Sequence, residues 1–104
     1  MKKLEKDGKV AVLVSPGYGA GWSTWTTQYG EELCMDADIV EAVLAEDYKK
    51  AVKITTEKYG EHIYTGGVYD LVVEWVPKGA EFEITEYDGY ESLHLIGGRK
   101  YWKA

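Results

Sequence analysis

The chain has 104 residues, of which 45% are apolar and 29% charged, and its formal net charge is −6. This size supports one domain, residues 1–104, with a single modest core. The acidic balance excludes the basic surface that sequence-independent nucleic-acid binding needs, so no direct binding to nucleic acid is expected. No apolar run approaches the roughly 20 residues of a membrane helix, and the charged N-terminus lacks a signal-peptide core, so we expect a cytoplasmic protein without membrane contact.

The first expected strand covers residues 9–15. It follows a loosely docked start at residues 1–8, which ends in an Asp7-Gly8 turn. Its central residues are all apolar, so both faces should be covered, as in the middle of a sheet. Residues 28–35 fit neither the helical nor the strand period, although Leu33 and Met35 are expected to face the core.

Two helices are expected next, each with an aspartate before its first residue. Asp36 would cap a helix over residues 37–46, in which four aliphatic side chains share one face. Asp47 would cap a second helix over residues 48–59, and Gly60 would supply a left-handed C-cap. No strong breaker separates the two segments, so one continuous helix is the alternative.

The second half of the chain alternates with a period of two, which indicates strands. The expected strands cover residues 62–64, 70–76, 81–87, 90–96 and a short part of 97–104. Asp88-Gly89 between two alternating segments is typical of a two-residue hairpin turn. The order of elements predicts an α+β fold, in which one or two helices pack on one face of a largely antiparallel sheet of about four to five strands.

The hairpin turn also fixes which residues face each other. The apolar pairs Ile84–Leu93 and Phe82–Leu95 fall on one face of the hairpin, which supports the register. Glu86 would face Glu91 on that same face, although like charges directly across a strand pair are unfavourable. We expect both carboxylates to be exposed at the end of the hairpin, with a bound cation or a basic partner as alternatives.

A loop rich in glycine and aromatic residues follows the first strand. Its alternating glycines allow tight turns and close approach of a ligand, while its rings and hydroxyls suit a nucleobase, ribose or phosphate. The spacing matches neither a Walker A loop nor a dinucleotide-binding fingerprint. The expected ligand-binding residues here are Gly17, Tyr18, Gly19, Gly21, Trp22, Ser23, Thr24 and Trp25. The alternative is a structural loop whose tryptophans fill the core or a subunit interface.

Two further groups are candidates for binding. Arg99 and Lys100 could neutralise a phosphate if the chain end folds near the loop; otherwise they belong to a solvated tail. The hairpin tip could form an acidic, tyrosine-rich patch for protein contact, made of Glu86, Tyr87, Asp88, Tyr90 and Glu91.

The residues with metal-binding or nucleophilic side chains form no recognisable site. His62 and His94 have no ligand spacing to each other or to Cys34, so no metal site is expected. The single cysteine fits a reducing compartment and is expected to be a small buried apolar residue. No catalytic residues or cofactor are therefore assigned, and binding is favoured over catalysis.

Two phrases of the sequence suggest a relationship. They are SPGYGAGWSTW at residues 15–25 and WVPKGAEFEITEYDG at residues 75–89. Their combination resembles a group of small uncharacterised proteins encoded by tailed bacteriophages. The resemblance implies a protein that acts inside an infected bacterium, where small phage proteins often interfere with host defences by sequestering nucleotide second messengers or by blocking a host protein.

Two functions are consistent with these observations. The first is a non-enzymatic protein, expected to be a homo-oligomer, that sequesters a nucleotide-like small molecule with the glycine- and aromatic-rich loop. The alternative is an inhibitor that binds a basic host protein of defence or nucleic-acid processing through its acidic, tyrosine-rich surface. Steep dependence of binding on salt would distinguish the second from the first.

Overall fold

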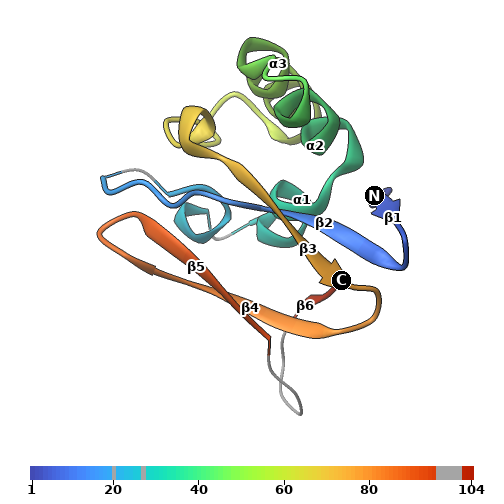
Figure 1. Cartoon of the computed structure of the whole chain (residues 1–104). Helices are drawn as coiled ribbons and strands as arrows, with labels where there is room; N and C mark the ends of the chain where they lie inside the picture. The colour runs from blue at the N-terminus through green and yellow to red at the C-terminus, as the bar shows by residue number, and fades with distance from the viewer. Residues whose placement is uncertain (20, 27, 96–101) are drawn as a thin grey trace.

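The protein has an α+β fold in which two sheets pack together and helices cover one side of them (Figure 1). The computed structural model describes residues 1–19, 21–26, 28–95 and 102–104. Within these residues the α-helices are α1 (Gly30–Met35), α2 (Ala37–Leu44) and α3 (Tyr48–Tyr59). The strands are β1 (Glu5–Lys6), β2 (Lys9–Val14), β3 (Val72–Pro77), β4 (Glu81–Tyr87), β5 (Tyr90–Leu95) and β6 (Trp102–Lys103).

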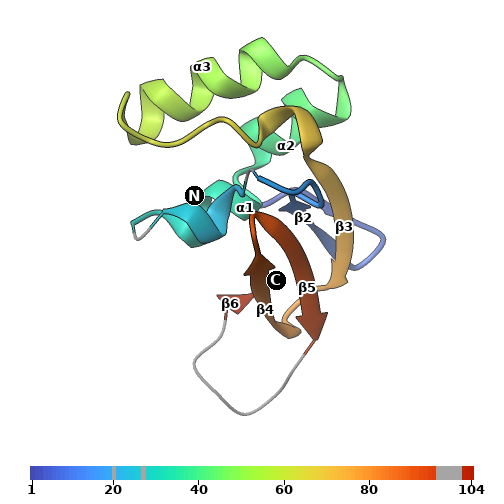
Figure 2. The same ribbon diagram turned by 90° about the vertical axis from the view of Figure 1, so that its left-hand side faces the viewer.

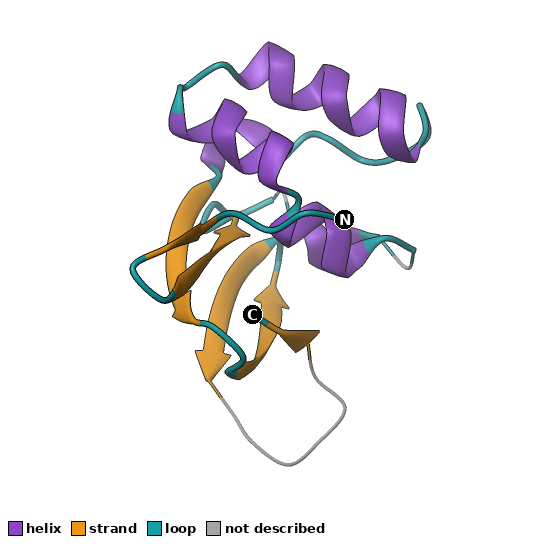
Figure 3. Cartoon of the chain, turned by 90° about the vertical axis from the view of Figure 1, so that its right-hand side faces the viewer, coloured by secondary structure: helices purple, strands orange, loops and turns teal. Residues whose placement is uncertain are grey.

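The strands are antiparallel, as predicted, but they divide between two sheets instead of forming one. One sheet has the order β1-β2-β3 and the other has the order β5-β4-β6. The helices α2 and α3 cover the outer face of the first sheet, and α1 lies beside the second sheet (Figures 2 and 3). No described helix is both long and apolar enough to cross a membrane.

Strand β2 is the centre of the fold, as its unbroken apolar sequence predicts. Ala11 and Leu13 pack against the helices α2 and α3, whereas Val10, Val12 and Val14 pack against the second sheet and α1. All five side chains are fully or almost fully buried. Because alternate side chains of a strand point to opposite faces, a strand with no polar face requires a layer on each side.

The hairpin β4–β5 has the register that its Asp-Gly turn predicts. Tyr87 faces Tyr90 and Glu86 faces Glu91. Asp88 and Gly89 both have positive φ angles, 51° and 87°, as a type I′ turn requires. Asp7 and Gly8 repeat this geometry, with φ angles of 53° and 76°. The expected loose start therefore contains a second hairpin, β1–β2.

The two predicted helices form separately, and each begins at its predicted aspartate. The carboxylate of Asp36 accepts a hydrogen bond from the Asp38 amide, and that of Asp47 accepts one from the Lys50 amide. Glu46 has a φ angle of 57°, which separates the helices. Gly60 ends α3 with φ 119° and ψ 153°, so the predicted left-handed C-cap is wrong, although the positive φ still favours glycine.

Two strand predictions differ from the structure. Residues 62–64 form a turn instead of a strand, because burying Ile63 alone does not require a strand partner. A 3₁₀ turn, Val68–Asp70, precedes β3, which starts two residues later than expected. The expected final strand exists as β6, which pairs with β4. The predicted end of β5 at Ile96 lies outside the described residues.

A partly buried polar cluster around Asp36 connects the end of α3 to the start of α2. Asp36, which is 3% exposed, accepts hydrogen bonds from Lys58 Nζ at 3.0 Å and Tyr59 Oη at 2.5 Å, in addition to its capping bond. Burial raises the pKa of Asp36, but the hydrogen bonds from Tyr59, Lys58 and the Asp38 amide outweigh it and hold this pKa below its usual value. The cluster therefore fixes the end of α3 against the start of α2.

Candidate binding surface

The loop after β2 is organised by one buried carboxylate, that of Glu91 in β5. Its Oε1 accepts a hydrogen bond from the Ser15 amide at 3.0 Å. Its Oε2 accepts three more, from the Trp22 amide at 2.8 Å and from the amide and hydroxyl of Thr24 at 3.0 and 2.6 Å. The Glu91 amide donates to the Ser15 carbonyl at 2.8 Å, which joins the two sheets. The loop thus binds the Glu91 carboxylate, an anion that belongs to the protein itself.

The expectation that Glu91 is exposed is wrong, because its side chain is 1% exposed. A buried carboxylate is stable when several N–H and O–H groups donate to it, and the loop supplies four such donors. Glu86, directly across the strand pair, is exposed and uses other donors: the Gly89 amide at 2.8 Å and Trp25 Nε1 at 3.3 Å. The two like charges are therefore each satisfied by separate N–H groups.

Three of the loop residues expected to bind a ligand are buried or hydrogen-bonded within the fold. The Trp22 ring is fully buried, and its Nε1 donates to the Leu33 carbonyl at 2.7 Å, so its faces are not open for stacking. Ser23 is also buried. Thr24 uses its amide and hydroxyl to hold Glu91. The alternative that a tryptophan of this loop fills the core therefore describes Trp22.

The hydroxyl of Ser23 gives a prediction about stability. Its Oγ is buried and has no hydrogen-bond partner among the described residues. Since an unsatisfied buried hydroxyl is costly, we expect Ser23→Ala to raise the free energy of unfolding by about 0.5–1 kcal/mol in urea denaturation. Thr24→Val is the control, because it removes a hydroxyl that donates to Glu91 and should lower that free energy by about 1–2 kcal/mol. Destabilisation by Ser23→Ala would contradict the prediction.

The other aromatic residues of the loop are exposed and pair with rings from elsewhere. Tyr18, which is 71% exposed, lies on Tyr90 with ring centroids 5.0 Å apart. Trp25 lies beside Tyr64, also at 5.0 Å. A Cβ atom added at Gly21 would lie 2.5 Å from Trp25 Cδ1, so this glycine lets the indole rest on the backbone.

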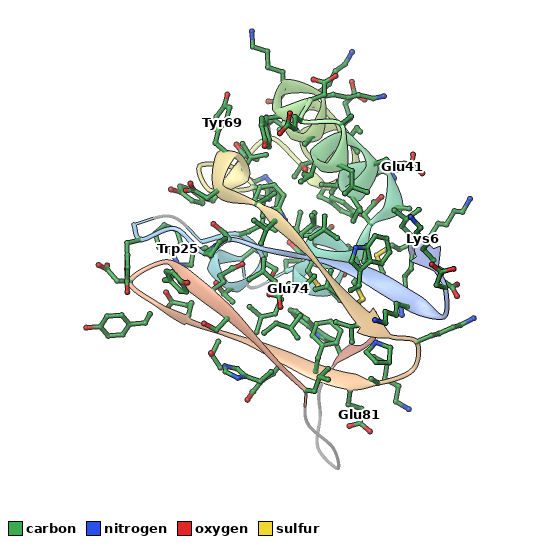
Figure 4. The ribbon with its side chains drawn as sticks, in the orientation of Figure 1. Lys6, Trp25, Glu41, Tyr69, Glu74 and Glu81 are labelled. Carbon is green, nitrogen blue, oxygen red and sulfur yellow. The ribbon has the colours of Figure 1, made fainter. Side chains whose placement is uncertain are left out.

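The exposed rings and carboxylates of three segments lie around the β4–β5 turn. Trp25 touches Glu86 through its indole nitrogen, and the Gly19 amide donates to the Asp88 carbonyl at 2.6 Å. Asp70 Oδ2 would lie 2.6 Å from a Cβ atom added at Gly17. We name as the acidic aromatic surface the residues Tyr18, Trp25, Tyr64, Asp70, Glu86, Tyr87, Asp88 and Tyr90. Figure 4 shows Trp25 near the β4–β5 turn, with Lys6 and Glu41 on the other side of the molecule.

Charge is segregated between this surface and the rest of the protein. Residues 10–48, 59–77 and 79–98, which supply the whole acidic aromatic surface, contain no lysine or arginine. Lysines instead cluster on α3 and near the N-terminus. Sequence analysis found the loop and the hairpin tip but missed Tyr64 and Asp70. Little in the sequence indicated either residue. Tyr64 is followed closely by two glycines, Asp70 belongs to a short 3₁₀ turn, and both are far from the loop along the chain.

The remaining candidate residues add no chemistry to this surface. Arg99 and Lys100 lie outside the described residues. Cys34 is buried, and burial, together with Glu31 and Glu91, raises the pKa of its thiol, which makes it a poor nucleophile. His94 Nε2 lies 3.1 Å from Thr85 Oγ1, and His62 is exposed. In the part of the chain that the structure describes, no three His, Cys, Asp or Glu side chains could hold a metal ion.

Comparison with known proteins found nothing similar to this chain. No family model, curated protein or solved structure matches the chain. Function is therefore inferred from the surface itself. That surface offers flat rings and negative charge, and its eight residues include no histidine, cysteine or lysine that could act as a base or nucleophile.

Proposed function

We propose that this is a non-enzymatic binding protein whose acidic aromatic surface docks on a basic protein partner. The observation that carries this proposal is the joint exposure of five rings and three carboxylates on segments without any lysine or arginine. Aromatic residues are enriched in the energetic centres of protein interfaces. Charges around them steer association with a partner of opposite sign. In a phage-infected bacterium, as the sequence resemblance implies, that partner would be a host protein.

The position of Glu91 favours a protein partner over a phosphate-bearing ligand. The amides of Ser15, Trp22 and Thr24, which could otherwise hold a phosphate, already donate to Glu91. A phosphate placed there would meet the carboxylate that occupies those amides. Like charges at such short range repel strongly in a buried setting.

The test is capture of a partner from a bacterial lysate, with the most exposed rings as the variable. We expect the wild-type protein to retain a basic protein at low ionic strength and to release it as salt rises, because screening shortens electrostatic range to about 8 Å at physiological ionic strength. Tyr18→Ser combined with Tyr87→Ser should abolish capture. Tyr69→Ser is the matched control, since Tyr69 is also exposed but lies against Tyr48 of α3. Equal loss with the control, or no capture at low salt, would refute the proposal.

A second candidate function is the sequestration of a nucleotide-like molecule, expected in a homo-oligomer. The two exposed ring pairs, Tyr18–Tyr90 and Trp25–Tyr64, favour it because bases stack on such faces. Mass spectrometry of the purified protein, native and after acid extraction, tests this function. A nucleotide released on denaturation, with an oligomer mass in the native spectrum, would support sequestration over protein docking.

A further inference from the structure

Tyr18 stands out within the acidic aromatic surface because one of its faces is supported and it is highly exposed. It is 71% exposed, and its ring lies 5.0 Å from the Tyr90 ring at an angle of 43°. Tyr90 belongs to β5 and is paired across the hairpin, so it gives Tyr18 a rigid backing. A ring held in this way offers its open side to a partner at little further entropic cost.

Two aspartates approach the glycines on either side of Tyr18, Asp70 through its side chain and Asp88 through its backbone. Asp70 approaches Gly17, where a Cβ atom would lie 2.6 Å from its Oδ2. Asp88 approaches Gly19, whose amide donates to the Asp88 carbonyl. Both aspartates are exposed, and neither carboxylate makes a hydrogen bond or ion pair with any described residue. Tyr18 thus has a highly exposed ring, and the glycines on either side of it are each approached by an aspartate whose carboxylate is unpaired among the described residues.

We propose that Tyr18, Asp70 and Asp88 form a subsite for the guanidinium group of an arginine side chain on the protein partner. This inference rests on the proposed function and names the group that the surface recognises. A guanidinium is planar, stacks on aromatic faces and is weakly hydrated. Its five N–H donors can reach two carboxylates at once, whereas a lysine ammonium is a compact and strongly hydrated point charge. A flat, exposed ring with two aspartates beside its neighbouring glycines suits a guanidinium better than an ammonium.

The experiment uses three blocked pentapeptides, Ac-Gly-X-Gly-X-Gly-NH₂, in which X is arginine, lysine or citrulline. Binding to the full-length protein is followed by NMR through the amide signals of Gly17 and Gly19. We expect the arginine peptide to bind about threefold or more tightly than the lysine peptide, and the citrulline peptide to cause no shift, because citrulline keeps the planar shape without the charge. Tyr18→Leu should weaken arginine binding about two- to fivefold.

The carboxylates are tested with a charge-matched pair of variants. Asp70→Asn with Asp88→Asn should weaken binding of the arginine peptide about two- to tenfold. Glu41→Gln with Glu57→Gln removes the same charge from exposed positions on α2 and α3 and should leave binding within about twofold of wild type. Asparagine tolerates the positive φ of Asp88, and dispersed amide spectra would verify that each variant is folded.

The outcomes separate this inference from the proposed function. Equal binding of the arginine and lysine peptides, or equal weakening by both charge variants, would overturn the arginine subsite while basic docking stands. Shifts caused by citrulline would overturn it as well. Failure of all peptides to bind would overturn the subsite alone if a basic protein is still captured from lysate, and would overturn both proposals if none is.

Discussion

Replacement of Glu91 by alanine is expected to lower the free energy of unfolding by about 4 kcal/mol. The change leaves three backbone amides and the Thr24 hydroxyl without their shared acceptor. Each unsatisfied buried donor costs about 1–3 kcal/mol, and water entering the space left by the side chain offsets part of that cost. A loss of this size is a large part of the roughly 5–15 kcal/mol that stabilises a typical domain.

Urea denaturation of Glu91→Ala measures this loss, and Glu86→Ala is its matched control. Glu86 stands directly across the hairpin but is exposed, so its removal should cost no more than about 1 kcal/mol. Glu91→Gln should fall between the two, because one amide oxygen replaces two carboxylate oxygens as acceptor. A Glu91→Ala protein as stable as the control would show that the loop does not depend on this carboxylate.

Replacement of Asp36 by asparagine is the second large effect, expected to cost about 2 kcal/mol. Asparagine can still cap α2, but it loses the charge-assisted hydrogen bonds with Lys58 and Tyr59. Lys58 is partly exposed, so solvent screening limits its share of this loss. Lys58→Met is a useful comparison, since it keeps the aliphatic stem and leaves Tyr59 bonded to Asp36; it should cost less than Asp36→Asn.

The same cluster makes part of the stability depend on pH. The folded pKa of Asp36 lies below its ordinary 3.8, so this contribution is present above that pH and is lost as pH falls through the folded value. For Tyr59, burial and then the Asp36 hydrogen bond raise the pKa; for Lys58, hydrogen bonds to Asp38 and Asp36 raise it. Their contributions are present below pH 10.0 and 10.5, respectively, and are lost at higher pH.

Melting temperatures across this pH range test the assignment. The difference in stability between wild type and Asp36→Asn should be greatest between about pH 5 and 9, and should shrink below pH 4 and above pH 10. Comparing the two proteins at each pH cancels the titration of the other acidic residues. A difference that stays constant at both ends would mean that Asp36 acts by shape alone.

The sequence predicted the local structure because local chemistry determines it. An Asp-Gly turn allows one hairpin register, so every pair in β4–β5 follows from Asp88 and Gly89. A carboxylate before a helix binds free N–H groups within the next few residues, which is why Asp36 and Asp47 were identified. The wholly apolar β2 could lie only between two layers.

The features that sequence analysis missed depend on contacts between distant segments. The local sequences of β3 and β4 do not indicate that these two strands belong to different sheets. The burial of Trp22 and of Glu91 likewise depends on where the loop meets β5. One signal was available: Glu91 falls on the apolar face of its hairpin, and a glycine-rich loop is a source of free amides. A charged side chain at an inward-facing position requires hydrogen-bond donors such as these amides.

The hydrogen bonds of Glu91 also determine at which stage of folding the acidic aromatic surface forms. They join groups 67 to 76 positions apart in the chain, so the loop takes its shape only after most of the polypeptide has assembled. The unfolded chain therefore has no such surface, and any partner that recognises it binds the native state alone. At a concentration 100 times its Kd, that partner would add about 2.7 kcal/mol to stability and raise the Tm by more than about 10 °C. Thermal shift could thus find the partner without advance knowledge of what it does.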